Sequence, residues 1–317
     1  MKQAVVLLNL GGPDSIESIE PFLTNLFSDR EIFKIPFFQE TIAKIIAKKR
    51  APKSSTQYKK IGNSSPINYW TELQRKKLSE ELKEFGIDVF IGMRYWKPLI
   101  SETAREIKMK NYEKVLLLPL YPQYSFSTTR SSFNEWKKNY DLNNCIFVES
   151  YFNDPNYIKA INNRINQAFK KIENANYRNT AILFSAHGLP KSFIKKGDPY
   201  EQQIYKTVER VIADRDLNFK YFVSFQSKIG PVKWLKPSTI ETIKIIAKNE
   251  INNLIVVPIS FVSDHIETLF EIDIEYRKFA NSIGIKNFVI TEGLNDMSEF
   301  ILALKFLTIN YLNLKYD

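Results

Sequence analysis

Eight short apolar segments, separated by stretches with helical periodicity, constrain the fold of this chain more than any other feature. The short segments are rich in Val, Ile, Leu and Phe, as buried strands are. Alternation of strands and helices predicts parallel sheets that are covered on both faces. The expected strands are Gln3–Leu10, Asp88–Met93, Lys114–Leu120, Cys145–Glu149, Thr180–Ala186, Phe219–Phe225, Asn253–Ile259 and Asn287–Thr291. The clearest helices are Ile16–Phe27, Trp70–Phe85, Ser101–Lys110, Pro155–Ile172, Tyr200–Ala213, Ser238–Asn249 and Ile266–Ile283.

The strands form two groups of four, which predicts two similar Rossmann-like α/β domains, each a four-stranded parallel sheet flanked by helices. We place the domains at residues 1–150 and 151–317, with the last helix free to pack on the first domain. The loops after the first three strands of each half echo one another, through duplication or through shared topology. The echoing pairs are LNLGGP and FSAHGLP, GMRYWKP and FQSKIGPVKWLKP, and LPLYPQYSFSTT and VPISFVSDHIET. Since ligands bind beyond the carboxyl ends of parallel strands, we expect these loops to line an active-site cleft between the domains.

The first half carries an insertion between its first two strands. These strands start about 85 residues apart, against about 39 in the second half, and such a length suggests a function. The insertion, at about residues 27–70, contains the apolar segment Ile32–Phe38, an expected helix at Glu40–Ala47 and the basic cluster Lys48-Lys49-Arg50. Apolar side chains beside basic ones suit a lip that covers a flat apolar ligand or contacts a membrane surface. A helical hairpin packed on its own domain is the alternative.

Composition narrows the class of protein. The chain has 44% hydrophobic and 25% charged residues, as globular proteins do. The formal net charge of +10 favours an anionic partner, although a Lys-rich surface explains part of it. The single cysteine, Cys145, cannot form an internal disulfide or ligate a four-thiolate cluster, which fits a reducing, cytoplasmic location. No apolar run reaches the roughly 18 residues of a membrane span, and Ala4–Leu10 leads into Gly-Gly-Pro-Asp as a strand leads into a loop, not as a signal peptide.

Both histidines of the chain lie in loops that are expected to face the ligand. His187 follows the first strand of the second half, and His265 follows the third. Glu267, Glu271 and Glu275 then recur every four residues along one helix face, and a π-turn would align them better. Stacked carboxylates repel unless a cation or solvent relieves them, and a solvated face alone explains Glu275. Imidazole with carboxylate suits a first-row divalent metal such as ferrous iron, whereas zinc-cluster, phosphate-loop, dinucleotide and nucleophile-elbow motifs are absent from the sequence.

From end to end the chain resembles ferrochelatases. The resemblance covers about residues 4–295 and lies in LNLGGPDSIESIEPFLTNLF, KKRAPKSSTQYKKIGNSSPI, GMRYWKP, LPLYPQYSFSTTRSS, SAHGLP, GDPYEQQ, FQSKIGPVKWLKP and VPISFVSDHIETLFEIDIEY. It implies the chelatase fold. It also implies insertion of ferrous iron into protoporphyrin IX, which gives protohaem and releases two protons at the last step of haem synthesis.

The resemblance also assigns roles to residues. His187 and Glu267 would hold the metal or take the pyrrole protons, with His265 beside them as a further catalytic residue. The residues that would relay protons outward or metal inward are Glu271, Glu275 and Asp264. The porphyrin-binding residues that it implies are Leu10, Arg50, Tyr58, Ser65, Arg94, Tyr95, Tyr121, Ser125, Gln226, Trp234 and Phe261. Of these, Arg50, Tyr58 and Ser65 would meet the propionates, for which an Arg–carboxylate pair gives a physical basis.

Two departures from the family concern cofactors and partners. Relatives with an iron–sulfur cluster carry a cysteine in the PQYS loop and three more in a C-terminal extension, whereas here the loop has Phe126 and the chain ends at Asp317. We therefore expect no cofactor beyond the substrate ferrous iron, no iron–sulfur cluster and a monomer. We expect no nucleic-acid partner and a cytoplasmic location, with peripheral membrane contact through Ile32–Phe38.

Three alternatives stay open at this point. The first is a ferrochelatase acting on coproporphyrin, and the second is another tetrapyrrole chelatase, for example one that uses cobalt. The Phe-rich lip favours the less polar protoporphyrin. The third is a haem or porphyrin carrier without turnover, against which the pair of His187 and Glu267 argues because a carrier has no use for it.

Overall fold

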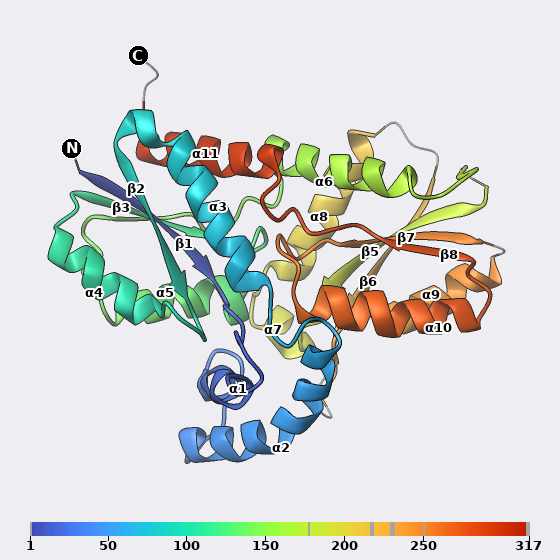
Figure 1. Cartoon of the computed structure of the whole chain (residues 1–317), viewed down its shortest axis with the longest axis horizontal. Coiled ribbons are helices and arrows are strands. Elements are labelled where there is room, and N and C mark those ends of the chain that lie inside the picture. The colour runs from blue at the N-terminus through green and yellow to red at the C-terminus, as the bar shows by residue number, and fades with distance from the viewer. Residues whose placement is uncertain (1, 177, 216–218, 229–231, 250, 315–317) are drawn as a thin grey trace. The chain divides into compact units, whose positions relative to one another are not determined.

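The structure, a computed structural model, describes residues 2–176, 178–215, 219–228, 232–249 and 251–314. It divides into two compact units, which are described separately here. Unit 1 comprises Met1–Tyr151 with Asn295–Asp317, and unit 2 comprises Phe152–Leu294. Each unit contains one four-stranded sheet in which all strands are parallel (Figure 1). Residues 229–231 of the segment FQSKIGPVKWLKP lie outside the described residues.

The sheet of unit 1 has the strand order β2-β1-β3-β4, so the chain reverses direction across the sheet between β1 and β3. Its strands are β1 (Gln3–Asn9), β2 (Ile87–Met93), β3 (Lys114–Pro119) and β4 (Cys145–Phe147). Its helices are α1 (Ile19–Ser28), α2 (Gln39–Lys59), α3 (Ile67–Glu81), the 3₁₀ helix η1 (Lys83–Phe85), α4 (Ile100–Lys110), the π-helix η2 (Phe126–Arg130), α5 (Ser131–Lys137) and α11 (Ser298–Leu312).

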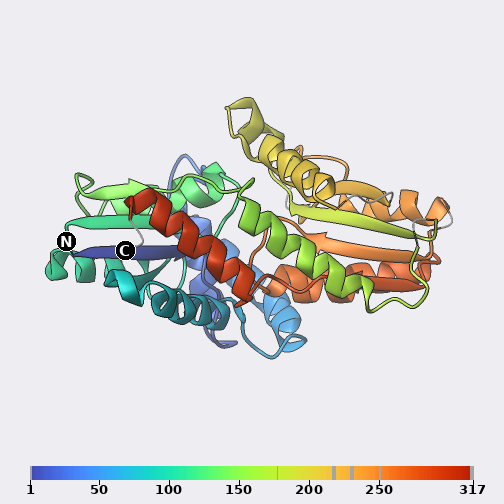
Figure 2. The same ribbon diagram turned by 90° about the horizontal axis from the view of Figure 1, so that it is seen from above.

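Helices cover both faces of the unit 1 sheet. Successive side chains of a strand point to opposite faces, and every residue of β1 is buried, as expected for a strand inside a parallel sheet. On one face Val6 and Leu8 pack with residues of α4 and α5, among them the fully buried Trp136. Helix α11 packs on α3 and β3 of the same unit, and Figure 2 shows it crossing the strands obliquely.

Unit 2 repeats this topology with the strand order β6-β5-β7-β8. Its strands are β5 (Thr180–His187), β6 (Lys220–Gln226), β7 (Asn253–Pro258) and β8 (Asn287–Ile290). Its helices are α6 (Pro155–Phe169), α7 (Lys191–Lys195), α8 (Tyr200–Ala213), α9 (Thr239–Lys248), the π-helix η3 (Glu267–Tyr276) and α10 (Arg277–Ser282). The core on one face joins Leu183 and Val256 of the sheet to Ile243 of α9 and Ile272 of η3.

The eight expected strands are all present, each within two residues of its expected bounds. This confirms the two four-stranded α/β sheets flanked by helices. Continuous runs of Val, Ile and Leu are a strong signal for strands buried on both faces, which explains the agreement.

Two helix predictions are wrong in detail. The helix expected at Glu40–Ala47 extends from Gln39 to Lys59 and includes both the basic cluster and Pro52. Proline removes one backbone donor and normally bends a helix, and Figure 1 shows the axis of α2 turning partway along. The hydroxyls of Ser55 and Thr56 donate to carbonyls of the preceding turn, Ser55 Oγ to Ala51 O and Thr56 Oγ1 to Pro52 O. The helix expected at Ile266–Ile283 is instead the π-helix η3 followed by α10.

Candidate active site

The site residues of unit 2 gather where its strand order reverses, between β5 and β7. His187 ends β5, and its backbone N–H donates to Ser260 Oγ beyond β7 over 2.9 Å. Gly188 comes next, where a Cβ would lie 2.5 Å from the backbone oxygen of Gln226. Only glycine therefore lets the ends of β5 and β6 approach this closely. Such a reversal point is where parallel α/β sheets bind ligands.

His187 and Glu267 form a direct pair at this point. His187 Nδ1 lies 2.8 Å from Glu267 Oε2, and the two side chains keep 34% and 25% of their surface exposed. Burial opposes a charged imidazole, but attraction to Glu267 outweighs it, so the pKa of His187 is raised. Burial likewise opposes the charged carboxylate, but His187 lowers the pKa of Glu267 to about 2. An ionised carboxylate only accepts hydrogen bonds, so Nδ1 carries the proton and the neutral ring keeps its lone pair on Nε2.

Glu271 continues the carboxylate line one turn further along η3. Ser227 Oγ lies 3.1 Å from Glu267 Oε2 and 2.5 Å from Glu271 Oε2, so one hydroxyl stands between the two carboxylates. Ser227 N–H and Tyr276 OH both donate to Glu271 Oε1, over 3.0 and 2.5 Å. Burial, with Glu267 nearby, raises the pKa of Glu271. The acidic side chains of η3 therefore differ in how readily they hold a proton.

The π-helical geometry of η3 keeps residues four apart on nearly the same face, because each backbone bond spans five residues. Glu267 and Glu271 are partly buried and Glu275 is exposed, so the carboxylates lead from the site to solvent. Asp273 belongs to another face and pairs with Arg277. The alignment that the spacing of the three glutamates suggested is thus present.

His265 has a different setting from His187. It is buried, with Nδ1 3.1 Å from Ser263 O and its ring centroid 4.4 Å from that of Phe261. Phe261 also meets His187 edge-on at 6.2 Å, so its ring contacts both imidazoles. Burial lowers the pKa of His265, although Glu267 and Asp264 oppose the shift. His265 is therefore the weaker base of the two.

Asp264 is engaged with the backbone of its own unit. Its Oδ1 accepts from Thr268 Oγ1 over 3.0 Å, and its carboxylate accepts from Gly293 N–H over 3.2 Å. It also lines a cavity of about 380 Å³ together with Asp273 and Arg277. These contacts hold the loop ahead of η3 and favour a structural part for Asp264.

Two further residues expected to bind porphyrin differ in burial. Gln226 is 1% exposed, accepts from Ser185 Oγ over 2.7 Å and donates to Glu267 Oε2 over 3.3 Å, so it orients that carboxylate. Trp234 is half-buried beside Gly188, and its buried indole N–H has no hydrogen-bond partner within the described part of the chain. The rings of Phe261 and Trp234 are partly accessible to a ligand, whereas the side chain of Gln226 is buried.

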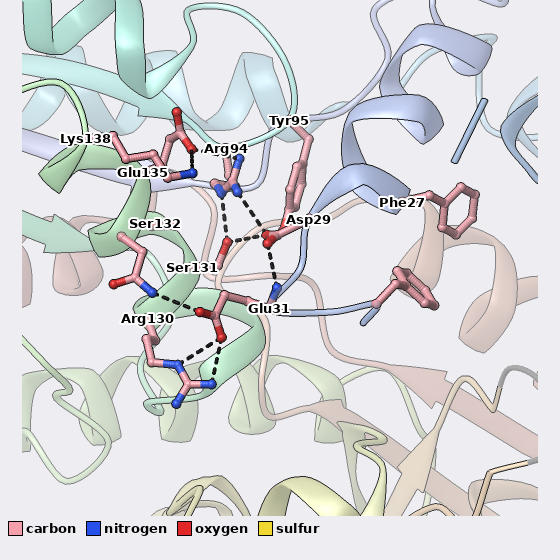
Figure 3. A network of polar contacts seen from close by, with 12 residues as sticks. Phe27, Asp29, Glu31, Arg94, Tyr95, Arg130, Ser131, Ser132, Glu135 and Lys138 are labelled. Carbon is pink, nitrogen blue, oxygen red and sulfur yellow. Dashed lines mark hydrogen bonds and ion pairs between the residues drawn. The ribbon is translucent and has the colours of Figure 1, made fainter. Parts of the chain in front are cut away.

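Arg94 and Tyr95 follow β2 of unit 1 and join a polar network (Figure 3). Arg94 Nη2 lies 3.1 Å from Asp29 Oδ2, and Arg94 Nε donates to Ser131 Oγ over 2.8 Å. Tyr95 OH donates to Asp29 Oδ2 over 2.6 Å, and Ser131 Oγ donates to the same oxygen. Asp29 is thus the centre of the network, and nothing in the sequence singled it out.

The other expected porphyrin residues of unit 1 are spread over several elements. Leu10 and Arg50 are half-buried, and Arg50 lies over the ring of Phe27 at 5.8 Å. The four that are less than a tenth exposed are Tyr58, Ser65, Tyr121 and Ser125. Ser125 caps η2 by accepting from Ser127 N–H, and Tyr121 OH lies 3.4 Å from Ser132 Oγ. Ser65 N–H donates to Pro13 O, and a Cβ on Gly12 would lie 2.5 Å from Ser65 Cβ, which packs the first loop closely on this segment.

The sequence reasoning missed four residues that touch the central carboxylates or hold His187: Ser227, Tyr276, Ser260 and Tyr200. Ser227 and Tyr276 stand inside the motifs FQSKIGPVKWLKP and VPISFVSDHIETLFEIDIEY, which is the signal that could have identified them. Ser227 also has a positive φ of 59°, a strained conformation for a residue other than glycine, and such strain concentrates at functional sites.

The pair of His187 and Glu267 can accept protons and can offer a divalent cation one nitrogen and one oxygen ligand. Within the described ranges, no group of three or more His, Cys, Asp or Glu side chains is arranged to hold a metal ion. Nor does any helix there have the length and apolar character to cross a membrane.

Solved structures with the same architecture identify the class of fold. SirB from Bacillus subtilis with Fe3+ matches 99% of this chain and 97% of its own, with a TM-score of 0.59 and 10% identity. CbiX, the terminal enzyme for biosynthesis of siroheme in denitrifying bacteria, matches 97% of this chain and 99% of its own, with a TM-score of 0.52 and 11% identity. The fold is therefore the chelatase fold.

Sequence comparison then identifies the family. The ferrochelatase family model matches residues 2–312. A ferrochelatase of Aquifex aeolicus (strain VF5) is 45% identical over 98% of this chain and 99% of its own length. One of Geotalea uraniireducens (strain Rf4) is 46% identical over 95% of each. The chain belongs to the ferrochelatase family, and it is a metal-chelatase enzyme that inserts iron into a porphyrin in haem synthesis.

Proposed function

We propose that this enzyme inserts ferrous iron into protoporphyrin IX, giving protohaem and releasing two protons, at the terminal step of haem synthesis. The observation that carries the proposal is the contact of 2.8 Å between His187 and Glu267, at the point of unit 2 where the strand order reverses. Family membership supplies the reaction class, and this pair supplies groups that suit its chemistry.

His187 acts through Nε2. Because Glu267 engages Nδ1, the lone pair of the neutral ring is on Nε2, where it takes a pyrrole proton or ligates the incoming iron. The carboxylate also stabilises the imidazolium that forms when the ring takes a proton. The raised pKa of His187 favours this proton transfer. His187 and Glu267 are thus the proposed catalytic and metal-binding pair, with His265 as a secondary catalytic residue.

Protons leave along η3. Glu271 holds a proton more readily than Glu267, since burial and its neighbour raise its pKa, and Glu275 beyond it is exposed. A proton that leaves the pair therefore has an acceptor between it and solvent. Asp264 is a weaker candidate for this relay because its oxygens already bind Thr268 and the backbone of Gly293.

We assign porphyrin recognition to candidate side chains that are accessible in their own unit. Leu10, Trp234 and Phe261 provide apolar surface, and Arg50 provides a cation for a propionate. Within the described residues, Arg50 forms no ion pair with an acid, which leaves its charge available. The candidates with little exposed surface are assigned a supporting part within their own unit: Tyr58, Ser65, Arg94, Tyr95, Tyr121 and Ser125 in unit 1, and Gln226 in unit 2.

The remaining proposals concern cofactor, assembly and location. We infer that the enzyme needs no resident cofactor and no iron–sulfur cluster, and that it acts as a monomer in the cytoplasm. Phe37 and Phe38 are 77% and 80% exposed beside the basic helix α2, which suits peripheral contact with an anionic membrane surface. Sedimentation with anionic vesicles tests the contact, since the variant with both residues changed to Ser should bind less.

Insertion assays with protoporphyrin IX and coproporphyrin, run side by side with ferrous iron without oxygen, test the function. We expect a larger kcat/KM for protoporphyrin, because the apolar surface near Phe37 and Phe38 suits two propionates better than four. A larger kcat/KM for coproporphyrin would mean that coproporphyrin, and not protoporphyrin, is the substrate. Tight binding of both porphyrins without metal insertion would support a carrier and overturn the proposal.

A further inference from the structure

We propose that two ion pairs of unit 1, Asp29–Arg94 and Glu31–Arg130, form an anchor that fixes the apolar segment Ile32–Phe38 for porphyrin entry. The four residues of this anchor are positioning residues, which act through the segment and do not touch the substrate. The proposal rests on the proposed function in one respect, namely that the segment meets the porphyrin.

The inner pair is buried and fully engaged. Asp29 keeps 3% of its side-chain surface and Arg94 keeps 14%, and their charged atoms lie 3.1 Å apart. Each nitrogen of the guanidinium has a partner: Nη2 has Asp29, Nε has Ser131, and Nη1 lies 3.7 Å from Glu135. A guanidinium engaged in this way has little capacity left for a propionate, which is why Arg94 is assigned a positioning role.

The outer pair fastens the next residues of the same chain segment. Arg130, the last residue of η2, donates from Nη2 and Nε to Glu31 Oε2 over 2.7 and 3.1 Å. Asn134 of α5 donates to Glu31 Oε1 over 2.9 Å, and Figure 3 shows Arg130 directed at the carboxylate of Glu31. The guanidinium of Arg130 also covers the ring of Phe126 at 3.4 Å. Asp29 and Glu31 are thus bound to elements that follow β2 and β3.

These contacts order the segment Ile32–Phe38, which follows Asp29 and Glu31 directly. Asp29 Oδ1 accepts from Glu31 N–H over 2.8 Å, and the backbone oxygen of Asp29 accepts from the N–H groups of Ile32 and Phe33. At the other end, the buried Gln39 donates to Phe27 O and Phe33 O and accepts from Ile35 N–H over 2.9 Å. The segment is therefore held at both ends, while the rings of Phe37 and Phe38 stay exposed.

An exposed apolar loop held this firmly loses little entropy when a ligand binds to it. Without the anchor the segment would sample more conformations and porphyrin binding would have to order it, which raises KM. The chemical step in unit 2 would be unaffected. A rise in KM with kcat preserved is therefore the signature of the anchor, and a general loss of folding would instead reduce the active fraction and hence kcat.

A charge swap of the outer pair in the full chain tests this. E31R and R130E each place like charges together, whereas the double variant E31R/R130E restores an opposite pair. We expect each single variant to speed chymotrypsin cleavage after Phe33, Phe37 and Phe38 by about fivefold to tenfold and to raise the porphyrin KM by a similar factor. In the double variant, both values should return to within about threefold of the unaltered chain.

Arg30 provides the matched control, because it lies between the two acids, is exposed and forms no ion pair within the described residues. R30E makes the same charge change as R130E and should leave cleavage and KM unaltered. Equal effects of R30E and R130E, or no recovery in the double variant, would overturn the anchor.

The variant F37S/F38S separates the anchor from the proposed function. It leaves both ion pairs in place, and we expect it to raise the porphyrin KM. If its KM is unchanged while the swap still controls cleavage, the anchor stands and the role of the segment in porphyrin entry is wrong. If the swap does not control cleavage, the anchor is wrong whatever F37S/F38S does.

Discussion

A π-helix follows the third strand of both units, η2 after β3 and η3 after β7, so the two stand at the same place in the same topology. Around η2 the acids are matched by guanidinium groups: Asp29 by Arg94 and Glu31 by Arg130. Each of these cations carries its charge at every physiological pH. The network around η2 is therefore complete without any ligand.

Around η3 the charges do not balance. Glu267 and Glu271 share one serine hydroxyl, and the only base in direct contact with Glu267 among the described residues is His187, which can lose its charge. Their pKa values move in opposite directions, down for Glu267 and up for Glu271. Such separation of neighbouring carboxyl groups is a property of sites that transfer protons or bind cations.

The difference between the partners of the acids shows how the same topology can hold a structural network in one unit and a reactive site in the other. A π-helix stands at the same place in each unit, but η2 supplies the cation Arg130 to acids that follow α1, whereas η3 itself supplies the acids Glu267 and Glu271. With arginine partners the acids fasten chain segments, and with a histidine partner they retain capacity for protons and metal. The comparison predicts that changes around η3 affect turnover more than stability, and that changes around η2 do the reverse.

Replacing His187 by Ala should produce the largest effect. Insertion of iron, or of zinc as a substitute, should fall by about 10²–10⁴-fold, the usual contribution of a positioned general base. Porphyrin binding, followed by fluorescence quenching, should change little because the ring of Phe261 remains. The change of His265 to Asn should cost less turnover, since its Nδ1 already faces Ser263 O and its pKa is lowered. Full activity of the His187 variant would remove this histidine from the mechanism.

The sequence was sufficient for the sheets and for the central pair, because both depend on local patterns. Runs such as Ala4–Leu8 predict buried strands directly, and the ends of β5 and β7 then carry His187 and the DHIET segment to the same edge of the sheet. The spacing of Glu267, Glu271 and Glu275 likewise suggested a widened helix. Because parallel strands end at the same edge of the sheet, residues that follow different strands come to lie close together.

The anchor could not be predicted, because its members come from distant segments with no shared pattern. Asp29 and Glu31 follow α1, Arg94 follows β2, and Arg130 ends η2, and only the folded chain brings them together. The extent of α2 was missed for another reason. Pro52 normally signals a helix end, but in this chain the helix continues past it to Lys59. The anchor is thus a product of long-range contacts, which no local pattern encodes.

Changing Asp29 to Asn is expected to have the second largest effect, this time on stability. The substitution keeps the shape but leaves the buried guanidinium of Arg94 without its main anion, for which a loss of about 3–5 kcal/mol is typical. Urea unfolding of the full chain measures it. In unit 2, Glu271→Gln should cost little or stabilise the chain, because it removes a buried charge next to Glu267. Equal losses for the two variants would mean that the acids of both units are structural.

The smallest expected effect is a pH dependence specific to unit 2. Glu267 has a lowered pKa, so its contribution to stability is present above about 4.5, its ordinary value, and is lost as the pH falls towards about 2. His187 has a raised pKa, so its contribution is present below about 6.5 and is lost as the pH rises through the raised value. The pair should therefore stabilise the fold most between about pH 4.5 and 6.5.

The difference in urea midpoint between the unaltered chain and Glu267→Gln should peak in that range and shrink on either side. The Asp29–Arg94 pair has no such upper limit, because arginine keeps its charge. A difference that stays constant above pH 6.5 would show that His187 does not titrate with Glu267, and the contrast between the two units would then lose its electrostatic basis.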